Sequence, residues 1–111
     1  MIRIEKLDDV TILVVDMARL DATTATAFHA QASPVIREAT KVVMDFSAVE
    51  FMDSTGIGAL VGVTKAIAPG GRIAMCGLSP AVETIFKLLR MDMFFIVAED
   101  RAGAAARLET V

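Results

Sequence analysis

Short runs of apolar, mostly β-branched residues alternate with longer segments of helical periodicity along this chain, and this alternation constrains the fold more than any other feature. A chain that alternates strands and helices over short connections forms a mainly parallel sheet covered by helices. The sequence therefore predicts an α/β fold with a mixed, mainly parallel β-sheet of four to five strands and about four α-helices. The predicted strands are Ile2–Glu5, Val10–Val15, Lys41–Phe46, Arg72–Cys76 and Phe94–Val97.

Prolines, glycines and hydroxyl residues mark the ends of the predicted helices. Pro34 lies inside the first helical segment and predicts one kinked helix or two short ones. Pro69-Gly70-Gly71 ends the second helix, and Ser79-Pro80 supplies an N-cap and a first-turn proline for the third. The predicted helices cover Asp21 to about Thr40, Ser54 to about Ala68, Ala81 to about Leu89 and Asp100 to about Leu108.

The composition favours one apolar domain over several. The 111 residues suffice for a single core and are too few for two, so we expect one domain over residues 1–111. Although 55% of the residues are hydrophobic, no stretch approaches the ~18 uncharged apolar residues of a membrane span. The N-terminus lacks the apolar region of a signal peptide. We therefore expect a cytoplasmic protein without direct membrane insertion.

The counts of particular residue types exclude several kinds of site. One cysteine, Cys76, and one histidine, His29, rule out an internal disulfide and a typical zinc site. We assign Cys76 to packing and give His29 no role. A net charge of −3 without tyrosine or tryptophan provides neither the electrostatic footprint nor the stacking platform for nucleic acid. We expect no metal, no cofactor and no nucleic-acid partner.

The segment Asp53-Ser54-Thr55-Gly56-Ile57-Gly58 gathers polar, hydroxyl and glycine residues where a loop enters a helix, a common place for function in α/β sheets. Capping of the helix by Asp53 or Ser54 is the simplest interpretation. A dinucleotide-binding motif would need glycine at Val61, and no Gly-Lys-Ser/Thr follows for a P-loop. An aspartic-protease triplet is interrupted by an extra residue, and Ser54 has no Gly-x-Ser-x-Gly context. We therefore expect binding, not catalysis.

Helical spacing favours a partner surface on the second helix. Ser54, Gly58, Gly62 and Lys65 follow at intervals of four, four and three residues and lie along one stripe that is nearly bare of side chains. Glycine inside a helix costs about 1 kcal/mol relative to alanine, so close approach of a partner or of a neighbouring element is expected there. A phosphate on Ser54 would be tolerated by the helix N-terminus but not by an apolar or acidic partner.

The same residues resemble the STAS family, and specifically the bacterial anti-sigma factor antagonists (anti-anti-sigma factors). The match runs from Phe51 to Gly58, and Ala18-Arg19-Leu20-Asp21, Gly70-Gly71-Arg72 and Leu78-Ser79-Pro80-Ala81-Val82 extend it over nearly the whole chain. Ala18 stands where the family usually has glycine. The resemblance implies a single STAS domain that is not an enzyme and takes part in transcription regulation by partner switching.

The resemblance also implies partners and a modification. Unphosphorylated, such proteins bind an anti-sigma factor that is also their serine/threonine kinase, which frees a sigma factor; a PP2C-type phosphatase reverses the phosphorylation. Ser54 would be the phosphorylated residue, with Thr55 as the less favoured hydroxyl. A constitutive scaffold or accessory subunit of stressosome or lipid/anion-transporter type is the alternative, and the chain would be a monomer or weak homodimer. The helix start, the bare stripe and the clustering of strand ends at one edge of the sheet together predict these partner-binding residues: Asp21, Asp53, Ser54, Thr55, Gly56, Gly58, Gly62 and Lys65.

Overall fold

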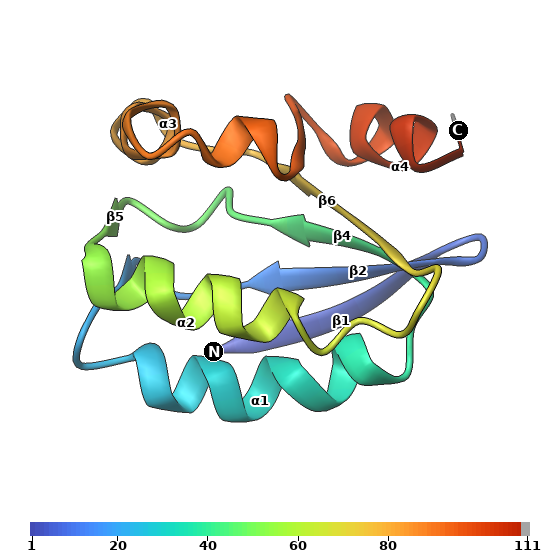
Figure 1. The fold of residues 1–111 in the computed structure, drawn as a ribbon, viewed down its shortest axis with the longest axis horizontal. Helices are drawn as coiled ribbons and strands as arrows, with labels where there is room; N and C mark the ends of the chain where they lie inside the picture. Colours follow the sequence, from blue (N-terminus) through green and yellow to red (C-terminus); the bar gives the residue numbers. More distant parts are fainter. Residues whose placement is uncertain (110–111) are drawn as a thin grey trace.

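Within residues 1–109, five strands form the central sheet in the order β1-β2-β4-β6-β7; Figure 1 labels the first four of them. β1 is antiparallel to β2, and all other neighbours are parallel. This computed structural model describes residues 1–109, so the last two residues of the predicted domain lie outside it. The mixed, mainly parallel sheet is confirmed. The strands are β1 Ile2–Leu7, β2 Val10–Val15, β4 Lys41–Asp45, β6 Arg72–Cys76 and β7 Ile96–Ala98.

Four α-helices cover the sheet, as the sequence predicts (Figure 1). Pro34 does not divide the first of them, which is one helix. The same helix starts later than expected, because Asp21 to Thr24 form a turn in which Thr23 N–H donates to Asp21 Oδ1 at 2.9 Å. Within residues 1–109, no helix is both long and apolar enough to cross a membrane. The helices are α1 Ala25–Arg37, α2 Ser54–Thr64, α3 Pro80–Leu88 and α4 Arg101–Glu109.

The side chains of each buried strand alternate between two cores, as the pleat requires. On β2, Leu13 and Val15 face the core built with α1, α2 and α3, whereas Ile12 and Val14 face the smaller core under α4. Cys76 belongs to the smaller core and is fully buried. Burial raises the pKa of its thiol to about 12, which agrees with the packing role predicted for it.

A two-stranded parallel ribbon, β3 (Arg19–Leu20) with β5 (Phe51–Met52), lies outside the main sheet and was not predicted. Each strand has only two residues, too few for a period-two pattern to be visible in the sequence. The ribbon continues into the next turn, where the Asp53 N–H donates to the Leu20 carbonyl at 3.3 Å. It therefore fixes the chain just before α2 begins.

The last strand begins two residues later than predicted. Phe94 and Phe95 precede it and follow a short 3-10 helix, η1 (Met91–Met93). Arg90 adopts a left-handed conformation (φ 58°) between α3 and η1 and turns the chain there. Four successive apolar residues read as a strand in sequence, but the turn at Arg90 places Phe94 at the surface, where 79% of it is exposed.

A buried carboxylate ties the end of β4 to α4. Asp45, at the end of β4, is 5% exposed. Its Oδ1 accepts hydrogen bonds from the Ser47 hydroxyl (2.6 Å) and amide (2.9 Å), and its Oδ2 accepts from Arg101 Nε at 2.7 Å. Burial opposes ionisation, but these donors outweigh it and hold the pKa of Asp45 below its usual range.

We expect this carboxylate to make the protein acid-sensitive. Because the pKa of Asp45 is lower in the folded than in the unfolded chain, its contribution to stability is present above the unfolded pKa and is lost as the pH falls through the folded pKa. The melting temperature should therefore drop below about pH 4. Asp45→Asn should flatten this dependence, and the exposed Asp92→Asn should keep it. Thermal unfolding followed by circular dichroism from neutral to acid pH checks both variants; identical profiles for wild type and Asp45→Asn would contradict the assignment.

Candidate functional site

Ser54 is the first residue of α2 and is exposed at the surface. Asp53 is the N-cap: its extended backbone (φ −111°) lets Oδ1 accept the Gly56 N–H at 2.9 Å. Asp53, not Ser54, therefore accepts the hydrogen bond of an N–H group that would otherwise be unpaired in the first turn of α2. Within the described part of the chain, no hydrogen bond involves the Ser54 hydroxyl, so this group is free at the end of a helix dipole that favours anions.

Loss of this cap has a measurable cost. We expect Asp53→Ala to lower the free energy of unfolding by about 1 kcal/mol, because the Gly56 N–H loses its acceptor. Asp53→Asn should retain most of the stability, since an amide oxygen accepts the same bond. Urea unfolding of the two variants measures the difference. Equal losses for alanine and asparagine would show that the charge of Asp53, not its cap bond, stabilises α2.

The three glycines of α2 lie in three different environments. A Cβ on Gly56 would be 1.9 Å from the Leu20 carbonyl oxygen, so this buried residue lets the β3–β5 ribbon cross the helix. A Cβ on Gly62 would meet the His29 ring at 3.3 Å, so α1 accounts for that glycine. Gly58 is exposed, and nothing lies within 4 Å of its Cβ position. Of these three glycines, only Gly58 has no neighbour among residues 1–109 that explains it, so the close approach of a partner remains the explanation for this glycine.

Asp21 lies at the carboxyl end of β3, beside the start of α2. It is 7% exposed, and its carboxylate accepts bonds from the Thr23 hydroxyl (2.6 Å) and from Arg19 Nε (2.9 Å). These donors lower the pKa of Asp21, the Thr23 hydroxyl most strongly. The guanidinium of Arg19 also stacks on the Phe51 ring, 4.2 Å from its centroid. Asp21 thus places a largely buried negative charge near Asp53. Its bonds to Thr23 hold the turn before α1 in place.

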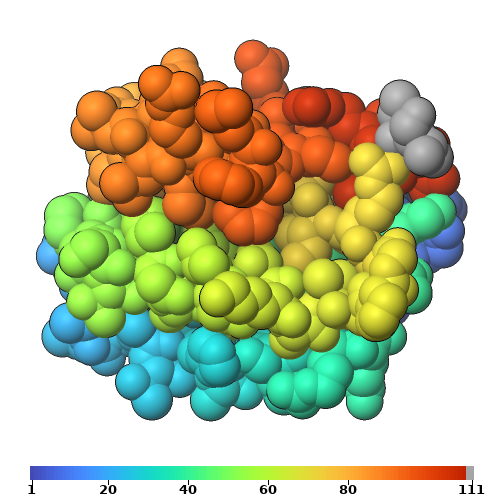
Figure 2. Space-filling model, viewed as in Figure 1, coloured from blue at the N-terminus to red at the C-terminus, as the bar shows by residue number. Residues whose placement is uncertain are grey.

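An apolar groove opens between the start of α2 and the end of α3, with Ser54 on its wall. Its volume is about 250 Å³. In Figure 2, α2 (green to yellow) forms a band between α1 (blue to cyan) and α3 (orange), so this end of α2 is open to solvent on the face shown. We call it the Ser54 groove. It is lined by Met52, Asp53, Ser54, Ile57, Ile85, Leu88 and Leu89.

The α3 side of this groove was not predicted. Leu88 is 76% exposed and Leu89 52%, and both lie beside the exposed turn that carries Met93 and Phe94. In this turn Met93 and Phe94 are exposed, whereas Met91 is buried and Phe95 is half-buried. The available signal was Leu88, which lies off the helical stripe of Val82, Ile85 and Phe86 that packs on the core.

The other predicted residues lie away from the groove. Thr55 faces α1, where it lines a wide depression with Ala25, Thr26 and His29. Lys65 is exposed at the opposite end of α2, as its C-cap. The predicted stripe from Ser54 to Lys65 therefore follows the helix, but its middle is partly covered by α1 through Gly62.

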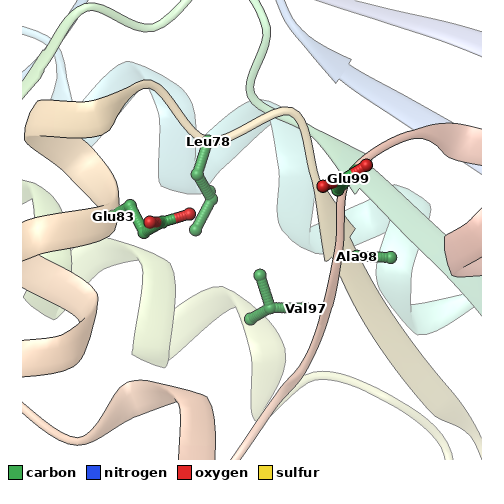
Figure 3. A pocket seen from close by; sticks show the side chains of 5 residues that line it. All are labelled: Leu78, Glu83, Val97, Ala98 and Glu99. Carbon is green, nitrogen blue, oxygen red and sulfur yellow. The ribbon is translucent and has the colours of Figure 1, made fainter.

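A second pocket, of about 390 Å³, lies at the carboxyl ends of β6 and β7 (Figure 3). Leu78 and Glu83 line one side of it, and Val97, Ala98 and Glu99 the other. Two carboxylates without a lining cation disfavour phosphate groups. Its lining residues also include no nucleophile paired with a base, so the pocket offers no catalytic arrangement.

Fold and site together define a small α/β domain that presents a capped helix N-terminus beside an apolar groove. The sequence model of the STAS domain matches residues 1–104. The chain belongs to the STAS domain family, as its sequence resemblance predicts.

Individual relatives agree with this family. The anti-sigma F factor antagonist of Paenibacillus polymyxa is 28% identical over 76 residues, which cover 68% of this chain and 65% of that protein. An anti-sigma factor antagonist from Mycobacterium paratuberculosis has a similar structure, with a TM-score of 0.88 at 23% identity over 97% of this chain and 92% of that one. The phosphorylated form of the Bacillus cell fate determinant SpoIIAA gives 0.68 at 21% identity, over 98% and 100%. At these identities, the solved structures establish the shared fold.

Proposed function

We propose that this chain is an anti-sigma factor antagonist whose unphosphorylated form binds an anti-sigma factor that is also a serine/threonine kinase, which releases a sigma factor. Phosphorylation of Ser54 ends the binding, and a PP2C-type phosphatase restores it. The observation that carries the proposal is the exposed Ser54 hydroxyl, left free by the Asp53 cap, on the wall of an apolar groove. The similarity to anti-sigma factor antagonists supports the same assignment.

The groove explains how one phosphate could act as a switch. Ile57, Ile85 and Leu88 offer apolar surface to a partner, and a partner that covers them removes water from the adjacent Ser54. A phosphoserine brings a charge of about −1.5 to −2. That charge would have to be desolvated next to Asp53, which makes binding unfavourable, whereas the α2 N-terminus tolerates it. The fold would stay intact while the interface is lost.

The geometry favours Ser54 over Thr55 as the modified residue. Ser54 lines the groove, whereas Thr55 faces the depression beside α1. A phosphate on Thr55 would therefore lie outside the apolar surface that a partner covers. Action by binding, without a cofactor and in the cytoplasm, is part of the same proposal.

Phosphorylation by the proposed partner, an anti-sigma factor that is also a serine/threonine kinase, tests the proposal directly. Incubation with that kinase and ATP, followed by mass spectrometry, should place one phosphate on Ser54. Ser54→Ala should abolish the modification, and Thr55→Ala, the matched control, should leave it unchanged. A stable complex with the kinase but no phosphate on Ser54 would instead support the constitutive scaffold or accessory subunit.

A further inference from the structure

β1 ends the sheet, and its hydrogen bonds leave half of its residues facing outward. The backbones of Met1 and Asp16 exchange both bonds, each 2.7 Å long. Directly opposed residues of an antiparallel pair alternate between bonded and non-bonded. Counted from Met1, the residues of β1 that bond to β2 are therefore Arg3, Glu5 and Leu7. Within residues 1–109, no strand pairs with the outward backbone groups of Ile2, Ile4 and Lys6.

We propose that two copies of this chain associate through their β1 edges, in an antiparallel pair centred on Ile4. In this register, the Ile4 residues of the two copies lie opposite each other and exchange backbone hydrogen bonds. Arg3 lies opposite Glu5 of the second copy, and Glu5 opposite its Arg3. The two sheets would join into one continuous sheet across a twofold axis.

The charges of β1 select this register. Pairings that keep the same hydrogen-bonding residues differ by two positions along the strand. A shift one way places Glu5 opposite Glu5, and a shift the other way places Arg3 opposite Arg3. Like charges directly opposite each other are destabilising, whereas opposite charges stabilise a strand pair. Charged side chains on an edge usually prevent pairing; here they oppose the shifted registers and favour one.

Exposed apolar surface on the α1 side of β1 supports the same pairing. Ile4 is 54% exposed and lines a groove of about 210 Å³ together with Val35 of α1 and with Ala39, which follows that helix. Lys6, Thr11 and Glu38 complete its lining. In the proposed pair, the two Ile4 side chains would lie side by side between the two α1 helices and cover each other. No residue of β1 lines the Ser54 groove. The dimer would therefore present two Ser54 grooves, and its formation does not depend on the proposed function.

Charge exchange tests the proposal without relying on a single disruptive variant. An edge-strand interface is small, so sedimentation equilibrium should cover roughly 10 μM to 1 mM protein. The wild type should dimerise in this range. Arg3→Glu and Glu5→Arg, measured separately, should each raise the dimer dissociation constant by about tenfold, because each places like charges opposite one another. An equimolar mixture of the two variants should recover association, since the acidic side chains at positions 3 and 5 of one variant then face the basic side chains at positions 3 and 5 of the other.

The mixture also provides the control. Arg3 and Glu5 form ion pairs with Asp16 and Arg101 within one chain, and mixing two folded variants cannot restore those pairs. Recovered association in the mixture therefore reports contact between β1 edges. A wild type that stays monomeric up to about 1 mM overturns the proposal, as do single variants that dimerise like the wild type or a mixture that does not associate.

Discussion

Ser54→Asp is expected to weaken binding to the anti-sigma factor kinase by about 100-fold, the magnitude typical of a charge left unpaired in a protein interface. The new carboxylate would lie beside Asp53, on the wall of an apolar groove that the partner covers. Ser54→Ala should bind like the wild type, because the Ser54 hydroxyl makes no hydrogen bond within residues 1–109. Isothermal titration calorimetry with the purified kinase measures all three affinities.

A matched control separates local from general effects of charge. Thr40 is also exposed, but it lies just before β4 and therefore near the amino ends of the parallel strands, away from the α2 start. Thr40→Asp adds the same charge there and should leave the affinity unchanged. If Ser54→Asp and Thr40→Asp bind equally, net charge and not the Ser54 groove governs the interaction.

Gly56→Ala is expected to destabilise the fold by about 3 kcal/mol, the upper part of the range for overpacking. The added methyl group would overlap the Leu20 carbonyl oxygen, which is backbone and is held by the β3–β5 ribbon. Gly58→Ala is the matched control in the same helix. It meets no atom within 4 Å and should stabilise α2 by up to about 1 kcal/mol. Urea unfolding compares the two, and equal effects would contradict the close crossing at Gly56.

The two variants also distinguish stability from binding. If a partner approaches α2 closely, Gly58→Ala should weaken binding even though the protein unfolds at higher urea concentration. A methyl group at Gly58 without effect on affinity would place the contact on the groove side of α2 alone.

The sequence predicted those parts of the fold that depend on local pattern. Apolar runs and punctuating residues identified the five strands of the main sheet and the four helices, because burial period and capping chemistry act over a few neighbouring residues. The β3–β5 ribbon was missed because two-residue strands have no period. Phe94 was placed in a strand because a left-handed turn at Arg90 is not visible in an apolar run.

The candidate site likewise combines residues that the local sequence identifies with residues that only tertiary packing brings together. Asp53, Ser54 and Gly56 stand together in sequence, so their junction was identified, although sequence alone left open which residue caps α2. The apolar wall of the groove comes from Ile85 and Leu88 on α3 and from its C-cap, Leu89. The position of these residues beside Ser54 depends on tertiary packing. Gly62 likewise owes its role to His29 on another helix. Long-range contacts of this kind leave no local signal.

The central claim is that Ser54 switches binding to an anti-sigma factor, and release of the sigma factor measures it most directly. A preformed complex of the kinase and its labelled sigma factor is mixed with this protein, either unphosphorylated or phosphorylated at Ser54, and free sigma factor is followed by fluorescence anisotropy. We predict release that saturates with the unphosphorylated form and none with the phosphorylated form at the same concentrations. Equal release by both forms, or none by either, would contradict the claim.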